Sequence, residues 1–123
     1  MANKIEQVAA TATKQILFAT QPSMSVGVVL GNTGVSADSN GKKIVKAGTP
    51  VTGSLEARTT AWKVSASDAV GVVLHDVDVT AGNENATVLI FGFVDLNKLD
   101  ASTVSLVNST AKTALAGKVT FLK

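Results

Sequence analysis

The chain's single histidine, His75, stands next to Asp76 and three residues before Asp78 in the stretch VGVVLHDVDV.

 An imidazole beside carboxylates is a combination used in general acid–base catalysis, and the same side chains bind divalent metals. Asp95 follows the next apolar run, ATVLIFGFV. These four side chains form either a site with chemistry or the polar rim of a hairpin.

The pattern around His75 matches no familiar catalytic or metal site. Zinc sites take several His or Cys ligands, and this chain has one histidine and no cysteine. A Ser-His-Asp triad needs a serine in a nucleophile turn, and the sequence has no G-x-S-x-G motif. Carboxylate pairs that hydrolyse glycosides lie in aromatic-rich clefts, whereas aromatic residues are only 4% of this chain. Asp76 and Asp78 with Asn83 and Glu84 lack the spacing of an EF-hand loop. We therefore expect no enzymatic activity, no cofactor and no specific metal site.

The alternation of residues 76–79 predicts how these side chains are placed. Val77 and Val79 alternate with Asp76 and Asp78, as on a half-buried strand. The two aspartates then share the solvent face. His75 falls on the Val77 face if the alternation is unbroken, so a cluster of all three would need a bulge between residues 75 and 76.

Composition limits the kind of domain that can position these residues. A chain of 123 residues predicts one domain. Apolar residues make up 46% of it, but there is no Tyr and only one Trp, so the core must consist mainly of Val, Leu, Ile and Ala. Such a core buries less area per side chain than one rich in aromatic rings, and a partner chain often adds stability to it.

Neither nucleic acid nor membrane is expected as a partner. The densest basic run, GKKIVK, lacks the arginines and aromatics typical of nucleic-acid sites, and it alternates like an edge strand guarded by lysine. The longest apolar runs fall well short of the roughly 20 residues that span a bilayer.

The order of local signals predicts a β-rich α+β domain preceded by an arm. Residues 1–22 contain no glycine and end at Pro22; their apolar residues have helical spacing, but QILFAT also suits a strand. After Pro22, short strands alternate with turns, including the hairpin signal Asn40-Gly41 and the turn AGTP. Residues 70–79 and 86–96 are expected as two strands, and KVTFLK as a closing strand. The stretch LDASTVSLVNSTAKTALAG predicts one short helix, with two short strands as the alternative. The expected architecture is a single barrel-like domain of short antiparallel strands over residues 23–123, with a helix near the C-terminus and an arm over residues 1–22.

Several of these segments, taken in order, resemble a known family. They are VKAGTPV, AVGVVLHDVDV, TVLIFGFVDLNKL, a predicted helix and LAGKVTFL, and together they cover roughly residues 44–123. This order resembles the head decoration proteins of tailed bacteriophages, the lambda-D-like family. The shared motifs are structural, because they consist of glycines and apolar residues.

The resemblance implies a virion structural protein and not an enzyme. Family members are late capsid-decoration proteins that bind the outer surface of the mature head as homotrimers at local threefold axes. There they join neighbouring major capsid protein subunits and stabilise the head against internal DNA pressure. The protein would be made in the host cytoplasm and reside on the virion. The arm would order on the capsid, where an extended segment can add to a sheet edge.

Two sets of residues are candidates for these contacts. Position and composition select the apolar and proline residues of the arm: Ile5, Val8, Ile16, Leu17, Phe18 and Pro22. The aromatic residues Trp62, Phe91 and Phe93 are candidates for the core or a trimer interface.

Two alternative functions are also compatible with the sequence. One is another virion module, such as the base of a head fibre or a tail component; a fibre base would be expected to carry a further domain. The other is a β module that binds cell-surface glycans, which would need exposed aromatics for stacking, with Trp62 as the strong candidate.

Overall fold

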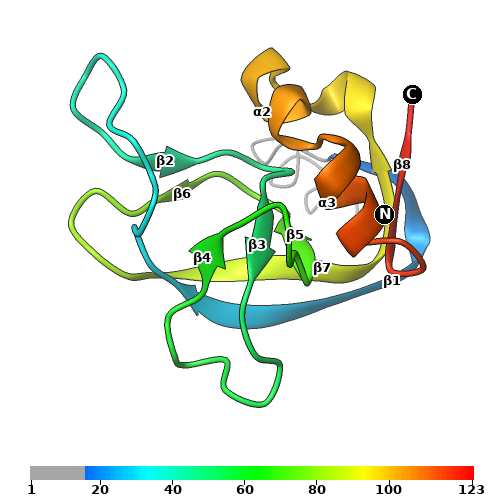
Figure 1. Ribbon diagram of the computed structural model, residues 1–123, viewed down its shortest axis with the longest axis horizontal. Helices are drawn as coiled ribbons and strands as arrows, with labels where there is room; N and C mark the ends of the chain where they lie inside the picture. The colour runs from blue at the N-terminus through cyan, green and yellow to red at the C-terminus, as the bar shows by residue number, and fades with distance from the viewer. Residues whose placement is uncertain (1–15) are drawn as a thin grey trace, which may run out of the picture.

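The computed structural model describes residues 16–123, with no account of the side chains of residues 18–21. Strands are the main regular secondary structure of this part of the chain, and two short helices lie near the C-terminus (Figure 1). The strands are β1 Leu17–Leu30, β2 Ile44–Val45, β3 Pro50–Thr52, β4 Lys63–Val64, β5 Gly71–Val73, β6 Val77–Asp78, β7 Glu84–Asp95 and β8 Val119–Leu122. The helices are the 3-10 turn η1 Leu96–Lys98, α2 Ala101–Leu106 and α3 Ser109–Ala114.

The main sheet curves until its two ends meet. Its strand order is β1-β7-β5-β3-β4, β8 lies parallel to β7, and β2 and β6 form a separate antiparallel pair. Trp62, just before β4, bridges Leu30 at the end of β1. The N–H of Trp62 donates to Val29 O at 2.8 Å, and the N–H of Gly31 donates to Trp62 O at 2.8 Å. These bonds connect the last strand to the first, so the predicted barrel-like, β-rich α+β fold is confirmed.

The two faces of the sheet are both covered by apolar side chains. Neighbouring residues of β5, Val72 and Val73, belong to different buried clusters, and so do Val88 and Leu89 of β7. The cluster around Val72 and Leu89 includes residues of the C-terminal helical segment, and Figure 1 shows α2 and α3 on one side of the sheet. Burial on both faces explains why these strands read as nearly continuous apolar runs.

The stretch predicted as one strand over residues 70–79 is divided in two. The N–H of Leu74 donates to Thr87 O at 3.0 Å, which is the last bond of this stretch to β7. The chain then bends at residues 74–76 and pairs with β2 as β6. The alternation of residues 76–79 is confirmed, because Val77 and Val79 are buried and Asp76 and Asp78 are exposed. His75 was expected on the Val77 face, and this is wrong: it lies in the bend and is exposed.

The single helix predicted near the C-terminus is two helices separated at residues 107–108. Asn108 is the N-cap of α3, and its side chain accepts a hydrogen bond from Ala111 N at 3.0 Å. A capping asparagine satisfies an amide that would otherwise lack a partner at the start of a helix, so it favours a new helix over continuation of α2. Gly117, with φ of 79°, follows α3 as expected for a helix stop.

Candidate functional site

His75 and Asp76 lie on one wall of an open cleft of about 670 Å³. The floor is the paired ends of β1 and β7, where Gly27 lies opposite Thr87. The opposite wall is the loop that contains Leu55, Glu56 and Arg58. The cleft therefore joins four segments of the chain, and it carries charges of both signs.

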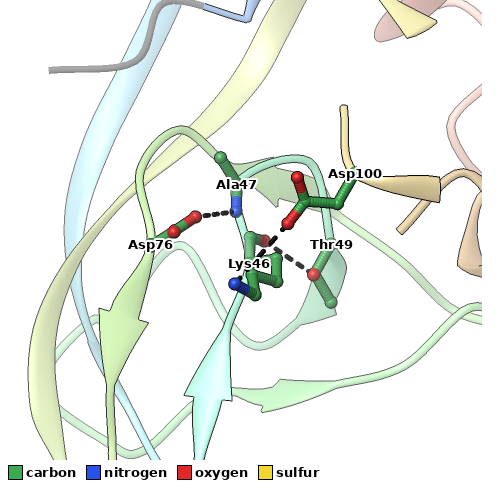
Figure 2. A network of polar contacts seen from close by, with 5 residues as sticks. All are labelled: Lys46, Ala47, Thr49, Asp76 and Asp100. Atoms are coloured by element: carbon green, nitrogen blue, oxygen red, sulfur yellow. Dashed lines mark hydrogen bonds and ion pairs between the residues drawn. The ribbon is translucent and has the colours of Figure 1, made fainter. Parts of the chain in front are cut away.

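The position of Asp76 gives it a structural role. Its carboxylate accepts a hydrogen bond from Ala47 N at 2.8 Å, which ties the bend at residues 74–76 to the AGTP turn (Figure 2). In that turn, the Thr49 hydroxyl donates to Lys46 O at 2.7 Å. Lys46 Nζ lies 3.5 Å from a carboxylate oxygen of Asp100, at the start of α2. Both side chains of this ion pair are nearly half exposed, so it contributes little to stability.

Asp78 also has a local partner. It accepts hydrogen bonds from the hydroxyl and the backbone N–H of Thr80, the latter at 2.9 Å. The Thr80 hydroxyl oxygen in turn accepts from Lys43 N at 2.8 Å. Through Thr80, the carboxylate supports the link between the end of β6 and the start of β2.

These bonds predict that the Asp78 carboxylate makes the free energy of unfolding vary with pH in the acid range. The Thr80 hydroxyl, then the Thr80 N–H, and to a smaller extent the charge of Lys42 lower the pKa of Asp78 below its usual value. A group with a lowered folded-state pKa stabilises the fold above its unfolded pKa, and this contribution is lost as the pH falls through the folded value. Urea unfolding across acid and neutral pH should therefore show Asp78→Asn less stable than wild type at neutral pH, with the difference shrinking in acid.

Thr80→Val removes the principal donor to Asp78 and serves as the second variant. It should weaken the same pH dependence, because the folded-state pKa of Asp78 then moves back towards its usual value. An equal stability difference between wild type and Asp78→Asn at every pH would contradict this account of the carboxylate.

Among the described residues, His75 belongs to no hydrogen-bonded or metal-ligating group of side chains. Within residues 16–123, the imidazole has no hydrogen-bond partner that would orient it as a general base. Over the same residues, no group of three or more His, Cys, Asp or Glu side chains is placed to hold a metal ion. Asp95 ends β7, and its carboxylate caps η1 by accepting from Asn97 N at 2.9 Å. The three aspartates Asp76, Asp78 and Asp95 thus stabilise turns and a helix start, whereas His75 holds neither.

The residues predicted for the arm fall into two groups. Ile5 and Val8 lie outside the described residues, as does the side chain of Phe18. Ile16 and Leu17 belong instead to the buried cluster beneath the helices, where Ile16 is fully covered, and Ile16 O accepts from Asp95 N at 3.0 Å. Pro22 is exposed but lies inside β1. The expected boundary at residue 22 therefore falls within a strand, and the described domain already includes Ile16.

The three aromatic candidates occupy different environments. Trp62 is 1% exposed and belongs to the cluster enclosed by the curved sheet. Phe93 is partly exposed, and Phe91 is 44% exposed. Phe91 lies opposite Met24, which is 58% exposed, in the ladder between β1 and β7. Sequence reasoning missed Met24, because its pairing with Phe91 depends on the irregular register of two distant strands.

Comparison with models of protein families and with curated protein sequences finds no match to this chain. No helix within residues 16–123 combines the length and apolar character needed to cross a bilayer.

Proposed function

We propose that this protein is a decoration protein of a tailed-bacteriophage head. It would bind the outer surface of the mature capsid as a homotrimer at local threefold axes, contact the major capsid protein and stabilise the shell against the pressure of packaged DNA. This role is structural, requires no cofactor and belongs to the virion.

The single observation that carries the proposal is the order of elements over residues 46–123. A tight turn at residues 46–49 precedes β5, the long strand β7 and two short helices, and β8 then closes the domain beside β7. The sequence segments that resemble the decoration family occupy these elements in the same order. The proposal thus rests on motif resemblance supported by a compatible fold.

Two parts of the chain are candidates for the proposed contacts: the arm and an exposed apolar pair on the sheet. The domain's own core includes Ile16 and Leu17, so an arm that binds the capsid would consist of residues 1–15. The exposed pair Met24 and Phe91 places two large apolar side chains next to each other on the sheet. Large exposed apolar side chains that cluster are typical of protein interfaces, whereas isolated ones are common on any surface.

Co-sedimentation with expanded, undecorated capsids of the protein's own phage tests the proposal. We expect the full chain to bind saturably, and a chain that begins at residue 16 to lose most of this binding. In the proposed homotrimer three linked arms would bind together and reinforce one another, so removal of the arms should have a large effect. The truncation should stop before Ile16, because deletion through residue 22 would also remove buried core side chains.

Circular dichroism and urea unfolding of the truncated chain provide the control for folding. Equal binding by a folded truncated chain would keep the function but move the contact to the domain surface. Failure of the folded full chain to bind any expanded capsid of its phage would reject the decoration role.

The burial of Trp62 bears on the glycan-binding alternative. That alternative relied on an exposed tryptophan for stacking on sugar rings, and Trp62 is enclosed in the core. No observation on the described residues favours it over the decoration role.

A further inference from the structure

The loop that joins β1 to β2 contains a tight turn at residues 38–42. In Figure 1 this loop projects from the end of the molecule away from the helices. The N–H of Asp38 donates to Lys42 O at 2.7 Å, and the N–H of Gly41 donates to Asp38 O at 3.0 Å. Gly41 has a φ of 77°. This is the geometry of a three-residue hairpin loop with a left-handed glycine, which agrees with the Asn-Gly signal in the sequence.

Asn40 and Gly41 are both open to solvent. Each is exposed, and the Asn40 side-chain amide has no hydrogen-bond partner among the described residues. A Cβ built on Gly41 would have no heavy atom within 4 Å, so the space around its backbone is empty. Each of the other asparagines in the chain precedes a residue with a side chain. Asn40 is therefore the asparagine whose side-chain carbon Cγ is most accessible to the backbone nitrogen of the following residue.

We propose that Asn40 is a site of spontaneous deamidation, and that Asp38 controls its rate. In this reaction the Gly41 nitrogen, after losing its proton to solvent base, attacks Cγ of Asn40. A bond forms between N and Cγ, the bond between Cγ and Nδ2 breaks, and ammonia leaves with a proton from solvent. Water then opens the resulting cyclic imide at either carbonyl, which gives an aspartyl or an isoaspartyl linkage. The reaction needs only water and no oxidant or reductant.

Asp38 opposes this reaction by holding the turn closed. Its carboxylate accepts hydrogen bonds from Asn40 N at 2.8 Å and from Lys42 N at 3.0 Å. While the turn is closed, the Gly41 N–H is also engaged with Asp38 O. The turn must therefore open before the Gly41 nitrogen can lose its proton and reach Cγ. A side chain that bonds to its own backbone in this way stabilises the turn.

Deamidation would change the charge and the geometry of the loop end. It replaces a neutral amide by a carboxylate, and the isoaspartyl product routes the backbone through an additional carbon. Lys43, close to this turn, donates its N–H to Thr80 and accepts at its carbonyl oxygen from Val79 N at 2.8 Å. The modification would therefore act next to the bonds that hold β2 beside β6, and the inference is independent of the proposed capsid role.

The experiment incubates the full chain in mildly alkaline buffer and follows each asparagine by peptide mapping and mass spectrometry. Enzymatic isoaspartate methylation identifies the isoaspartyl product. The expected result is a gain of one mass unit confined to Asn40, and none in Asn40→Gln. The same chain unfolded in urea lacks the closed turn. It should deamidate faster, and its rate is the reference for the unprotected reaction.

Two variants of Asp38 test its control of the rate. Asp38→Ala removes both hydrogen bonds to the carboxylate, so it should accelerate deamidation by at least about fivefold, the change in turn opening that corresponds to the loss of one ordinary hydrogen bond. Asp38→Asn retains an acceptor oxygen and should remain closer to wild type. The proposal is overturned if folded wild type stays unmodified while the unfolded chain reacts, or if Asp38→Ala reacts no faster than wild type.

Discussion

Replacing Trp62 with alanine should destabilise the folded domain by about 3–5 kcal/mol, the usual cost of removing a large aromatic side chain from a core. Trp62 is almost fully buried and lies where the sheet closes on β1. Its ring packs so closely on Gly53 that a Cβ at that position would lie 2.2 Å from Trp62 Cδ2. Urea unfolding followed by circular dichroism measures the loss, because the tryptophan fluorescence disappears with the substitution.

Two further variants show whether burial is the cause. Among the described residues the indole Nε1 has no hydrogen-bond partner, so Trp62→Phe loses no hydrogen bond there. Because phenylalanine also keeps much of the ring packing, it should cost less than Trp62→Ala. Phe91→Ala removes an aromatic side chain that is nearly half exposed, and its effect should be much smaller. A loss at Trp62 no larger than at Phe91 would be inconsistent with a core role for the tryptophan.

Gly71→Ala is the second change for which we expect a large loss of stability. Gly71 is buried in β5, and a Cβ there would lie 2.4 Å from Leu89 O and 2.6 Å from Val88 Cγ1. Leu89 O belongs to the backbone of β7, so it cannot rotate away like a flexible side chain. Forcing a methyl group into such a site costs roughly 1–3 kcal/mol, and sometimes more. The measurement is the free energy of unfolding in urea.

Gly27→Ala is the matched control for this substitution. Gly27 also lies in a strand, but a Cβ there has no heavy atom within 4 Å and its φ is not in the left-handed region. Its replacement should change stability by no more than about 0.5 kcal/mol, as for other open surface positions. Equal effects at Gly27 and Gly71 would mean that the close approach of β5 to β7 does not determine the cost.

The structure also changes how the capsid experiment should be designed. A break after residue 22, where the sequence changes character, would cut through β1 and remove Ile16 and Leu17 from the core. Loss of binding by such a chain would not distinguish a missing arm from a damaged domain. A break before residue 16 leaves the described core intact, so its effect on binding can be attributed to residues 1–15.

Several features were predictable from sequence because they depend on neighbouring residues. The alternation of Val77 and Val79 with two aspartates correctly predicts which side chains are buried. The Asn40-Gly41 pair predicts its turn, because glycine tolerates the left-handed conformation found there. Gly117 predicts the end of the helical segment for the same reason.

Other features depended on contacts between residues far apart in the chain. Nothing local in VGVVLHDVDV indicates that β5 stops where its pairing with β7 ends, or that Asp76 will bond to Ala47. Because that break places His75 in an exposed bend, only the tertiary structure could show its environment. The irregular pairing of β1 with β7 likewise brings Met24 beside Phe91.

The sequence by itself determined the β-rich class, the turns and most of the residues that can form a core. Periodicity and turn chemistry act over a few residues, and they can therefore be read from the chain directly. The tertiary structure alone decided that Ile16 and Leu17 pack inside the domain and that Trp62 closes the sheet against β1. An apolar side chain is compatible with either a core or an interface, and the choice between them depends on which distant surfaces meet when the chain folds.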